Sequence, residues 1–170
     1  MHSGSTARFG RLALCVAGSA LALAACSKKA EETTADTAAT TTAAAGVDVA
    51  ATPAPDNTDT VDGMKYAGYT GDAAAGKTAF ITCQTCHAVE PGVNKIGPSL
   101  HAIVGRQAGT VAGFSYTPAN KNSGITWTPE KLFQYLENPQ RVVPGTKMAF
   151  AGFPDAQKRA DVIAYLKTLS

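Results

Sequence analysis

Cys83-Gln84-Thr85-Cys86-His87 is the stretch that decides the fold of this 170-residue chain. Its pattern, C-x-x-C-H, is the signature of covalent haem c attachment. Two thiols at this spacing can add to the two vinyl groups of one haem, and His87 can then supply an axial imidazole to the iron. The motif therefore predicts a protein that moves single electrons through one covalently bound haem c.

Two other interpretations of the cysteine pair are weaker. A structural zinc site needs four ligands. The other cysteines, Cys15 and Cys26, lie in an N-terminal segment from which they cannot complete such a site in the mature protein. A thioredoxin-type dithiol would need a βαβ pattern around it, and the sequence shows none.

Residues 1–25 are predicted to be a lipoprotein signal peptide. Arg8 and Arg11 precede an apolar run that is too short for a comfortable transmembrane helix. The run ends in Leu23-Ala24-Ala25-Cys26, which resembles a bacterial lipobox. This resemblance implies cleavage before Cys26 and lipidation of that cysteine, and the alternative is an ordinary signal peptide cut nearby without acylation.

Residues 26–66 are predicted to be a disordered tether that follows the lipidated cysteine. The segment is rich in Ala, Thr, Asp, Glu and Pro, and residues 27–66 hold seven acidic residues against three lysines. Large apolar side chains are almost absent, so no core can form to offset the loss of chain entropy. The tether could let a small domain swing between partners, or serve only as a stalk that lifts the domain clear of lipid.

Residues 67–170 are predicted to form one domain with ten Lys and Arg against six Asp and Glu. Capping residues and apolar spacing predict helices over 72–82, 128–138 and 155–168. The first of these helices leads into the haem motif. Residues between His87 and Trp127 are glycine-rich and lack a periodic pattern. So long an irregular stretch is unusual in a compact domain unless something such as a buried haem organises it.

A second axial ligand must come from Met148 or His101. Met148 lies in the segment 144–150, between the second and third predicted helices. Because it is not on a helical face, a core-filling role is less supported. His101 follows His87 by only fourteen residues and is the weaker candidate. A thioether ligand raises the reduction potential relative to two imidazoles and closes the sixth position, which favours outer-sphere electron transfer.

Three stretches carry a resemblance to a known family. They are Gly113-Phe114-Ser115-Tyr116-Thr117-Pro118-Ala119-Asn120-Lys121-Asn122-Ser123-Gly124-Ile125-Thr126-Trp127, Tyr135-Leu136-Glu137-Asn138-Pro139 and residues 144–150. With the haem motif, they make the chain from Gly71 to about Leu169 resemble class I cytochrome c of the mitochondrial and short bacterial type. The resemblance implies an all-α fold whose helices wrap around one covalently bound haem.

The resemblance also implies a role for each site residue. Cys83 and Cys86 would form the thioethers, and His87 and Met148 would be the axial ligands. The Pro98 carbonyl would accept a hydrogen bond from His87. Tyr116 and Trp127 would donate to a buried haem propionate, and Arg106 would supply positive charge nearby. A polar network beside Met148 would consist of Asn120, Tyr135 and Thr146. Gly76 and Phe80 would meet Val162 and Tyr165 where the first and last helices cross.

The chain departs from the family around the exposed haem edge. Thr82, Gln140 and Pro154 stand where lysines are frequent in the family. A weak positive docking face could still be formed by four basic residues, Lys95, Lys121, Arg141 and Lys147. Electrostatic steering toward a partner should therefore be weaker than in a strongly basic carrier.

The sequence as a whole predicts a lipid-anchored monohaem carrier on the periplasmic side of a bacterial membrane. We expect it to be a monomer without enzymatic activity or affinity for nucleic acid. Its expected partners are a bc-type quinol:cytochrome c oxidoreductase and a terminal oxidase, or other periplasmic redox proteins. The alternatives are an electron-transfer module of one specific enzyme, or a peroxidase-like or gas-binding protein if Met148 is labile. Ser27 after the lipidated cysteine favours the outer membrane, whereas a respiratory role favours the inner membrane. Either membrane could therefore hold the anchor.

Overall fold

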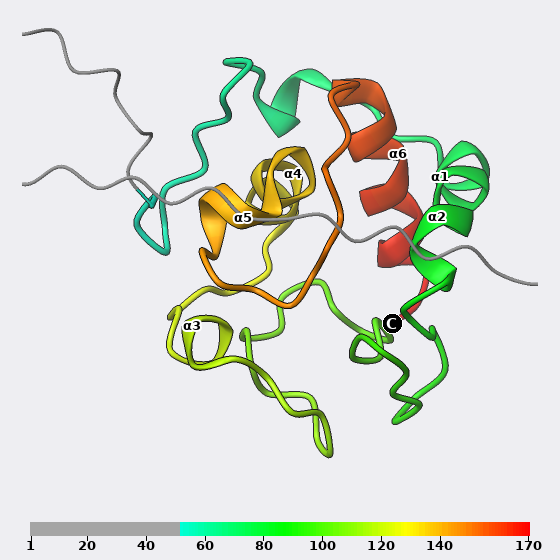
Figure 1. Cartoon of the computed structure of the whole chain (residues 1–170). Helices are drawn as coiled ribbons and strands as arrows, with labels where there is room; N and C mark the ends of the chain where they lie inside the picture. Colours follow the sequence, from blue (N-terminus) through cyan, green and yellow to red (C-terminus); the bar gives the residue numbers. More distant parts are fainter. Residues whose placement is uncertain (1–51) are drawn as a thin grey trace, which may run out of the picture. The chain divides into compact units, whose positions relative to one another are not determined.

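The computed structural model describes residues 52–170, and Figure 1 shows how their helices are arranged. The predicted signal peptide, the predicted lipidation site Cys26 and residues 27–51 of the predicted tether lie outside the described residues. Across residues 52–170, no helix has both the length and the apolar character needed to cross a bilayer.

The described part of the chain is helical. Its elements in order are the 3₁₀-helix η1 (Tyr66–Gly68) and the α-helices α1 (Ala73–Ala79), α2 (Ile81–Gln84), α3 (Pro118–Lys121), α4 (Pro129–Glu137), α5 (Pro139–Val142) and α6 (Ala156–Lys167). No strand forms in residues 52–170, where a single isolated antiparallel bridge joins Gln107 and Thr126. The predicted all-α class is therefore confirmed.

Local sequence signals account for where the three main helices begin. The Asp72 carboxylate accepts hydrogen bonds from the amides of Ala74 and Ala75 at 2.7 and 3.0 Å, and so caps α1. Thr128 caps α4 in the same way, with a proline at the first helical position. Asp155 caps α6. The predicted helices 128–138 and 155–168 are confirmed, whereas the one predicted over 72–82 is divided at Phe80 into α1 and α2.

Helices α1 and α6 pack against each other and form one wall of the fold (Figure 1). Gly76 permits this approach, because a Cβ atom there would overlap the backbone carbonyl of Asp161 on α6. Close by, the rings of Phe80 and Tyr165 lie 5.1 Å apart between centroids. The predicted crossing of the first and last helices is thereby confirmed, and it places the cysteine motif directly after this rigid junction.

The domain is predicted to begin at residue 67, and residues before that point also make contacts with it. Residues 53–66, which we call the N-terminal strap, pack on α4. The buried Lys131 ammonium donates to the carbonyls of Ala54 and Asn57 at 3.0 and 2.6 Å. The Gln134 amide donates to the Asp59 carbonyl at 2.7 Å. The strap is held mainly by polar and backbone contacts.

Candidate haem site

A cavity of about 420 Å³ lies among α2, α4, α6 and the loops that connect the helices. Most of its lining is apolar, including Phe80, Leu100, Leu132 and Phe150. Its volume falls in the range of small-molecule and cofactor sites. All eleven residues that the sequence placed at the cofactor line this one cavity: Cys83, Cys86, His87, Pro98, Arg106, Tyr116, Asn120, Trp127, Tyr135, Thr146 and Met148.

The two cysteines of the motif enter the cavity from α2 and the turn that follows it. The Cys86 and His87 amides both donate to the Cys83 carbonyl, at 3.1 and 2.9 Å, so one turn presents all three side chains. Both thiols are free. Burial raises the pKa of the Cys83 thiol to about 11, so this group stays protonated at neutral pH.

The surroundings of the cysteines do not suit a zinc site. Structural zinc is held by four ligands, with cysteine bound as thiolate. In residues 52–170, no cluster of three or more His, Cys, Asp or Glu residues could hold a metal ion.

His87 is fixed so that one ring nitrogen remains available. Its Nδ1 lies 2.8 Å from the Pro98 carbonyl, which can only accept, so Nδ1 carries the proton and Nε2 keeps a free lone pair. Burial lowers the pKa of His87, which keeps the imidazole neutral at pH 7. Gly97 lies against the ring, because a Cβ there would come within 2.7 Å of Nδ1. The Gly97 amide is itself tied to the Cys86 carbonyl at 2.8 Å.

Met148 reaches the cavity from the loop between α5 and α6, residues 143–155, which we call the ligand loop. The Met148 amide donates to the Thr146 hydroxyl at 3.3 Å, and that hydroxyl lies 3.4 Å from the Tyr135 hydroxyl. The structure thus brings together Tyr135 and Thr146 beside Met148. His101 does not line the cavity, and its carbonyl instead accepts from Arg106 at 2.8 Å.

Polar side chains line another part of the cavity. The Arg106 guanidinium donates to the carbonyls of Ser99 and His101, which holds its charge at the wall. Burial lowers the pKa of Arg106 and raises that of Tyr116, and both groups remain hydrogen-bond donors at neutral pH. The Asn120 side-chain oxygen is buried without a partner among residues 52–170. An unpaired acceptor oxygen needs a donor, whereas the Arg106 and Tyr116 donors are the groups at this wall that suit an anionic edge of a cofactor.

The sequence did not predict a site role for three residues at or beside the cavity. Gly97 supports the imidazole, and Phe114 lines the cavity with its ring 4.8 Å from that of Tyr116. Gln140 was noted only as a position where the family often has lysine. Its side-chain amide donates to the carbonyls of Thr146 and Met148, both at 3.2 Å. No periodic pattern marks these positions, because all three act from loops or from a short helix.

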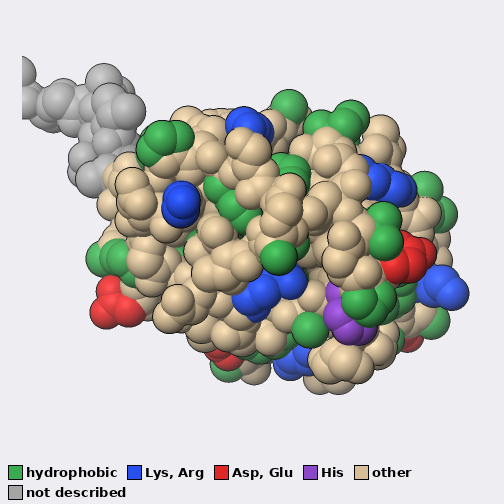
Figure 2. All heavy atoms as spheres, turned by 90° about the horizontal axis from the view of Figure 1, so that it is seen from below, with side chains coloured by type: hydrophobic (Ala, Val, Ile, Leu, Met, Phe, Trp, Pro, Cys, Tyr) green, Lys and Arg blue, Asp and Glu red, His purple; other side chains and the backbone are tan. Residues whose placement is uncertain are grey.

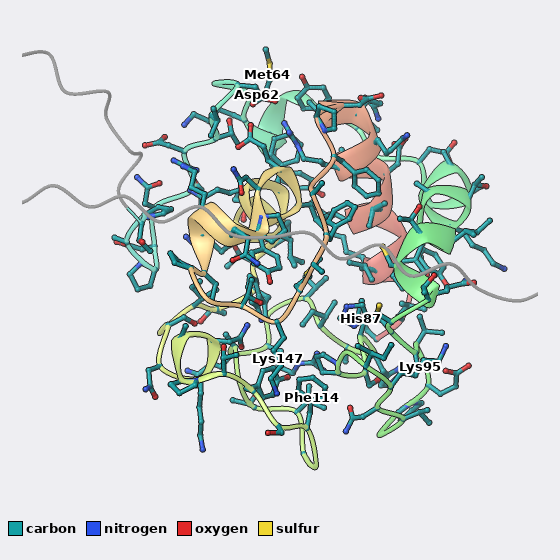
Figure 3. The ribbon with its side chains drawn as sticks, in the orientation of Figure 1. Asp62, Met64, His87, Lys95, Phe114 and Lys147 are labelled. Atoms are coloured by element: carbon teal, nitrogen blue, oxygen red, sulfur yellow. The ribbon has the colours of Figure 1, made fainter. Side chains whose placement is uncertain are left out.

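Figure 3 shows how the labelled side chains are distributed over the fold. His87, Phe114, Lys95 and Lys147 lie in its lower half, and Asp62 and Met64 of the N-terminal strap lie at the opposite end. Figure 2 views the molecule from below and shows separate Lys and Arg side chains interspersed with apolar ones. The basic charge on this face is spread out and does not form a dense ring.

Comparison with known proteins gives a consistent result. The family model described as Cytochrome c matches residues 73–170. The chain is 56% identical over 100 residues to cytochrome c2 of Rhodopila globiformis, covering 58% of this chain and 94% of that protein. It is 56% identical over 99 residues to cytochrome c of Gibberella zeae, covering 57% and 93%.

A solved structure gives the same answer for the fold. Cytochrome cH from Methylobacterium extorquens is 48% identical in sequence, with a TM-score of 0.55, and the match covers 58% of this chain and 99% of that one. The family model leaves residues 1–72 unmatched.

Proposed function

Because this chain belongs to the cytochrome c family, whose members hold one covalently attached haem c with His/Met ligation and carry electrons, we propose that Cys83 and Cys86 form the thioethers and that His87 and Met148 ligate the iron. One observation supports this assignment above the others. A single apolar cavity collects the cysteine pair, an imidazole with a free Nε2 and the one methionine of the ligand loop.

The haem, when bound, supplies the one-electron Fe(III)/Fe(II) couple. The chain's own residues set its surroundings. The hydrogen bond from His87 to Pro98 orients the imidazole and raises its basicity. The apolar walls exclude water. Arg106, Tyr116 and Trp127 would supply the charge and the hydrogen-bond donors that a buried propionate needs, and Asn120 would belong to the polar network beside Met148. Tyr135 and Thr146 support the backbone beside Met148.

A closed six-coordinate site makes this protein a carrier and not an enzyme, since no position is left for substrate at the iron. Its partners are redox proteins. The basic residues near the cavity opening are few, and the Lys95 and Lys147 ammonium groups, which keep their charge, donate to the Gln84 and Ser115 carbonyls at 3.0 and 2.7 Å. Encounter with an acidic partner should therefore depend only weakly on salt. A quinol:cytochrome c oxidoreductase as donor and a terminal oxidase as acceptor suit these properties.

An optical spectrum of the purified ferric holoprotein tests the ligand assignment. We expect the weak far-red band of a methionine–iron bond, and we expect the Met148→Ala variant to lose it and to bind carbon monoxide rapidly in the ferrous state. A His101→Ala variant is the matched control and should keep the band. If the wild type lacks the band at neutral pH and binds carbon monoxide rapidly, the carrier function is wrong.

The N-terminal part of the chain suggests where the carrier works. The lipobox-like Leu23-Ala24-Ala25-Cys26 supports lipidation of Cys26 and a position on the periplasmic side of a bacterial membrane. We propose that the chain between Cys26 and the strap, which begins at residue 53, is the tether. A Cys26→Ser variant should move from the membrane fraction to the soluble periplasmic fraction, whereas Cys15→Ser should not. Equal membrane recovery of both variants would contradict lipid anchoring.

A further inference from the structure

Arg159 of α6 is an unusual residue to bury completely. Its side chain has 0% exposure. The guanidinium lies over the ring of Phe133 on α4, 4.4 Å from the centroid. A buried cation is costly unless it is paired and hydrogen-bonded. The groups that compensate its charge therefore show which parts of the chain Arg159 holds together.

Those groups come from three separate segments. The Asp62 carboxylate of the N-terminal strap accepts from one terminal nitrogen of Arg159 at 2.5 Å. The Glu137 carboxylate, at the end of α4, lies 3.6 Å from the other terminal nitrogen. That second nitrogen also donates to the Phe153 carbonyl at 3.0 Å. The guanidinium thus joins the strap, α4 and the ligand loop at one point.

Glu137 extends the same junction back to the strap. Its two carboxylate oxygens accept from the backbone amides of Val61 and Asp62, at 2.7 and 2.9 Å. The strap therefore approaches Arg159 with its carboxylate already oriented by α4. Among the ion pairs of residues 52–170, Asp62 is the only acid of the strap that pairs with Arg159. Asp59 pairs instead with Lys65, which also belongs to the strap.

Phe153 lies close to the C-terminal end of the ligand loop. Its amide donates to the Leu136 carbonyl at 2.7 Å, and its ring lies 4.8 Å from that of Phe150, which lines the haem cavity two residues after Met148. The neighbouring Gly152 has no room for a side chain beside the Glu137 carbonyl. The position of Phe153 thus limits how far the loop can move away from the cavity.

We propose that Asp62 is a positioning residue for Met148: the strap carboxylate holds Arg159 against the Phe153 carbonyl and thereby restrains the ligand loop. This inference rests on the proposed function, in which Met148 ligates the iron. Asp62 touches neither the cavity nor Met148, and it acts through the contacts from Arg159 to Phe153. The strap is then part of the machinery that keeps the sixth coordination position closed.

The test is the rate at which imidazole, added to the ferric holoprotein, replaces the methionine ligand. Replacement requires the loop to open, so the rate reports on its restraint. We expect Asp62→Asn to bind imidazole about tenfold faster than the wild type, in line with the loss of one charge-assisted hydrogen bond. Asp59→Asn, which changes an exposed carboxylate paired within the strap, is the matched control and should leave the rate unchanged. Asp62→Glu should restore most of the restraint.

The possible outcomes separate this inference from the proposed function. If Asp62→Asn lowers the urea midpoint of unfolding but leaves the imidazole rate at the wild-type value, the strap only stabilises the fold and the inference is overturned. Equal acceleration by Asp59→Asn would overturn it too, because the effect would not be specific to Arg159. If the wild type itself lacks the far-red band, Met148 is not the ligand, and it is the proposed function that fails.

Discussion

At the scale of single residues, the orientation of His87 depends on two neighbours that contribute no chemistry of their own. Pro98 accepts the Nδ1 proton, and Gly97 leaves the space in which the imidazole lies. The histidine could be identified from the C-x-x-C-H pattern alone. The need for a glycine at position 97 could not, because the contact joins side chain and backbone ten residues apart and has no sequence signature.

Gly97→Ala should displace the imidazole, because the new methyl group would overlap the His87 ring. We expect a loss of about 1–3 kcal/mol in the free energy of unfolding of the holoprotein, together with a lowered yield of haem-loaded protein. Thermal or urea unfolding followed at the haem absorption band measures the first effect. Gly68→Ala is the control, since nothing lies within 4 Å of a Cβ at that position. Equal stability of the two variants would contradict this account of Gly97.

At the scale of elements, helices with strong capping signals could be located from sequence, and short ones could not. Helix α4 begins one residue after the predicted cap Thr128, and α6 begins one residue after Asp155, the predicted start of the last helix. Helices α3 and α5 have four residues each and carry no apolar period, so nothing distinguished them from loop. They matter because α3 brings Asn120 to the cavity, and α5 brings Gln140 to the ligand loop.

The strap is the element for which composition was most misleading. Its acidic, Ala- and Pro-containing sequence is typical of a disordered linker. The structure instead uses its carbonyls and carboxylates to compensate two cations that α4 and α6 bury, Lys131 and Arg159. Neither cation carries a local sequence signal that marks it as buried. Burial of a charged helix face could be recognised only with the covering segment in place.

At the scale of the whole molecule, the contact between Asp62 and Arg159 couples stability to pH. Burial alone would raise the pKa of Asp62, but the hydrogen bonds from Arg159 and from the Met64 amide lower it to about 2, against an ordinary value of 3.8. A carboxyl with a lowered folded-state pKa stabilises the native protein above its unfolded pKa. That contribution is lost as the pH falls from about 4 to about 2.

The wild type should therefore be more stable than Asp62→Asn at pH 5 to 7, and the difference should shrink between about pH 4 and pH 2. Urea midpoints of the two holoproteins at several pH values would measure this. Asp59→Asn is again a useful comparison, because its carboxylate is largely exposed and its ion pair with Lys65 should contribute little. A difference between wild type and Asp62→Asn that stays constant down to pH 2 would show that the ion pair is not the source of the effect.

The sequence by itself predicted the chemistry of this protein. The motif around Cys83 is local and predicts covalent haem attachment, and the resemblance of residues 113–127, 135–139 and 144–150 to class I cytochrome c implies the fold. Only the tertiary structure decided how His87 is held, where the folded domain begins and what restrains the ligand loop. Those features depend on contacts such as that between Asp62 and Arg159, 97 residues apart, which are polar, often involve the backbone, and therefore leave no periodic pattern in the chain.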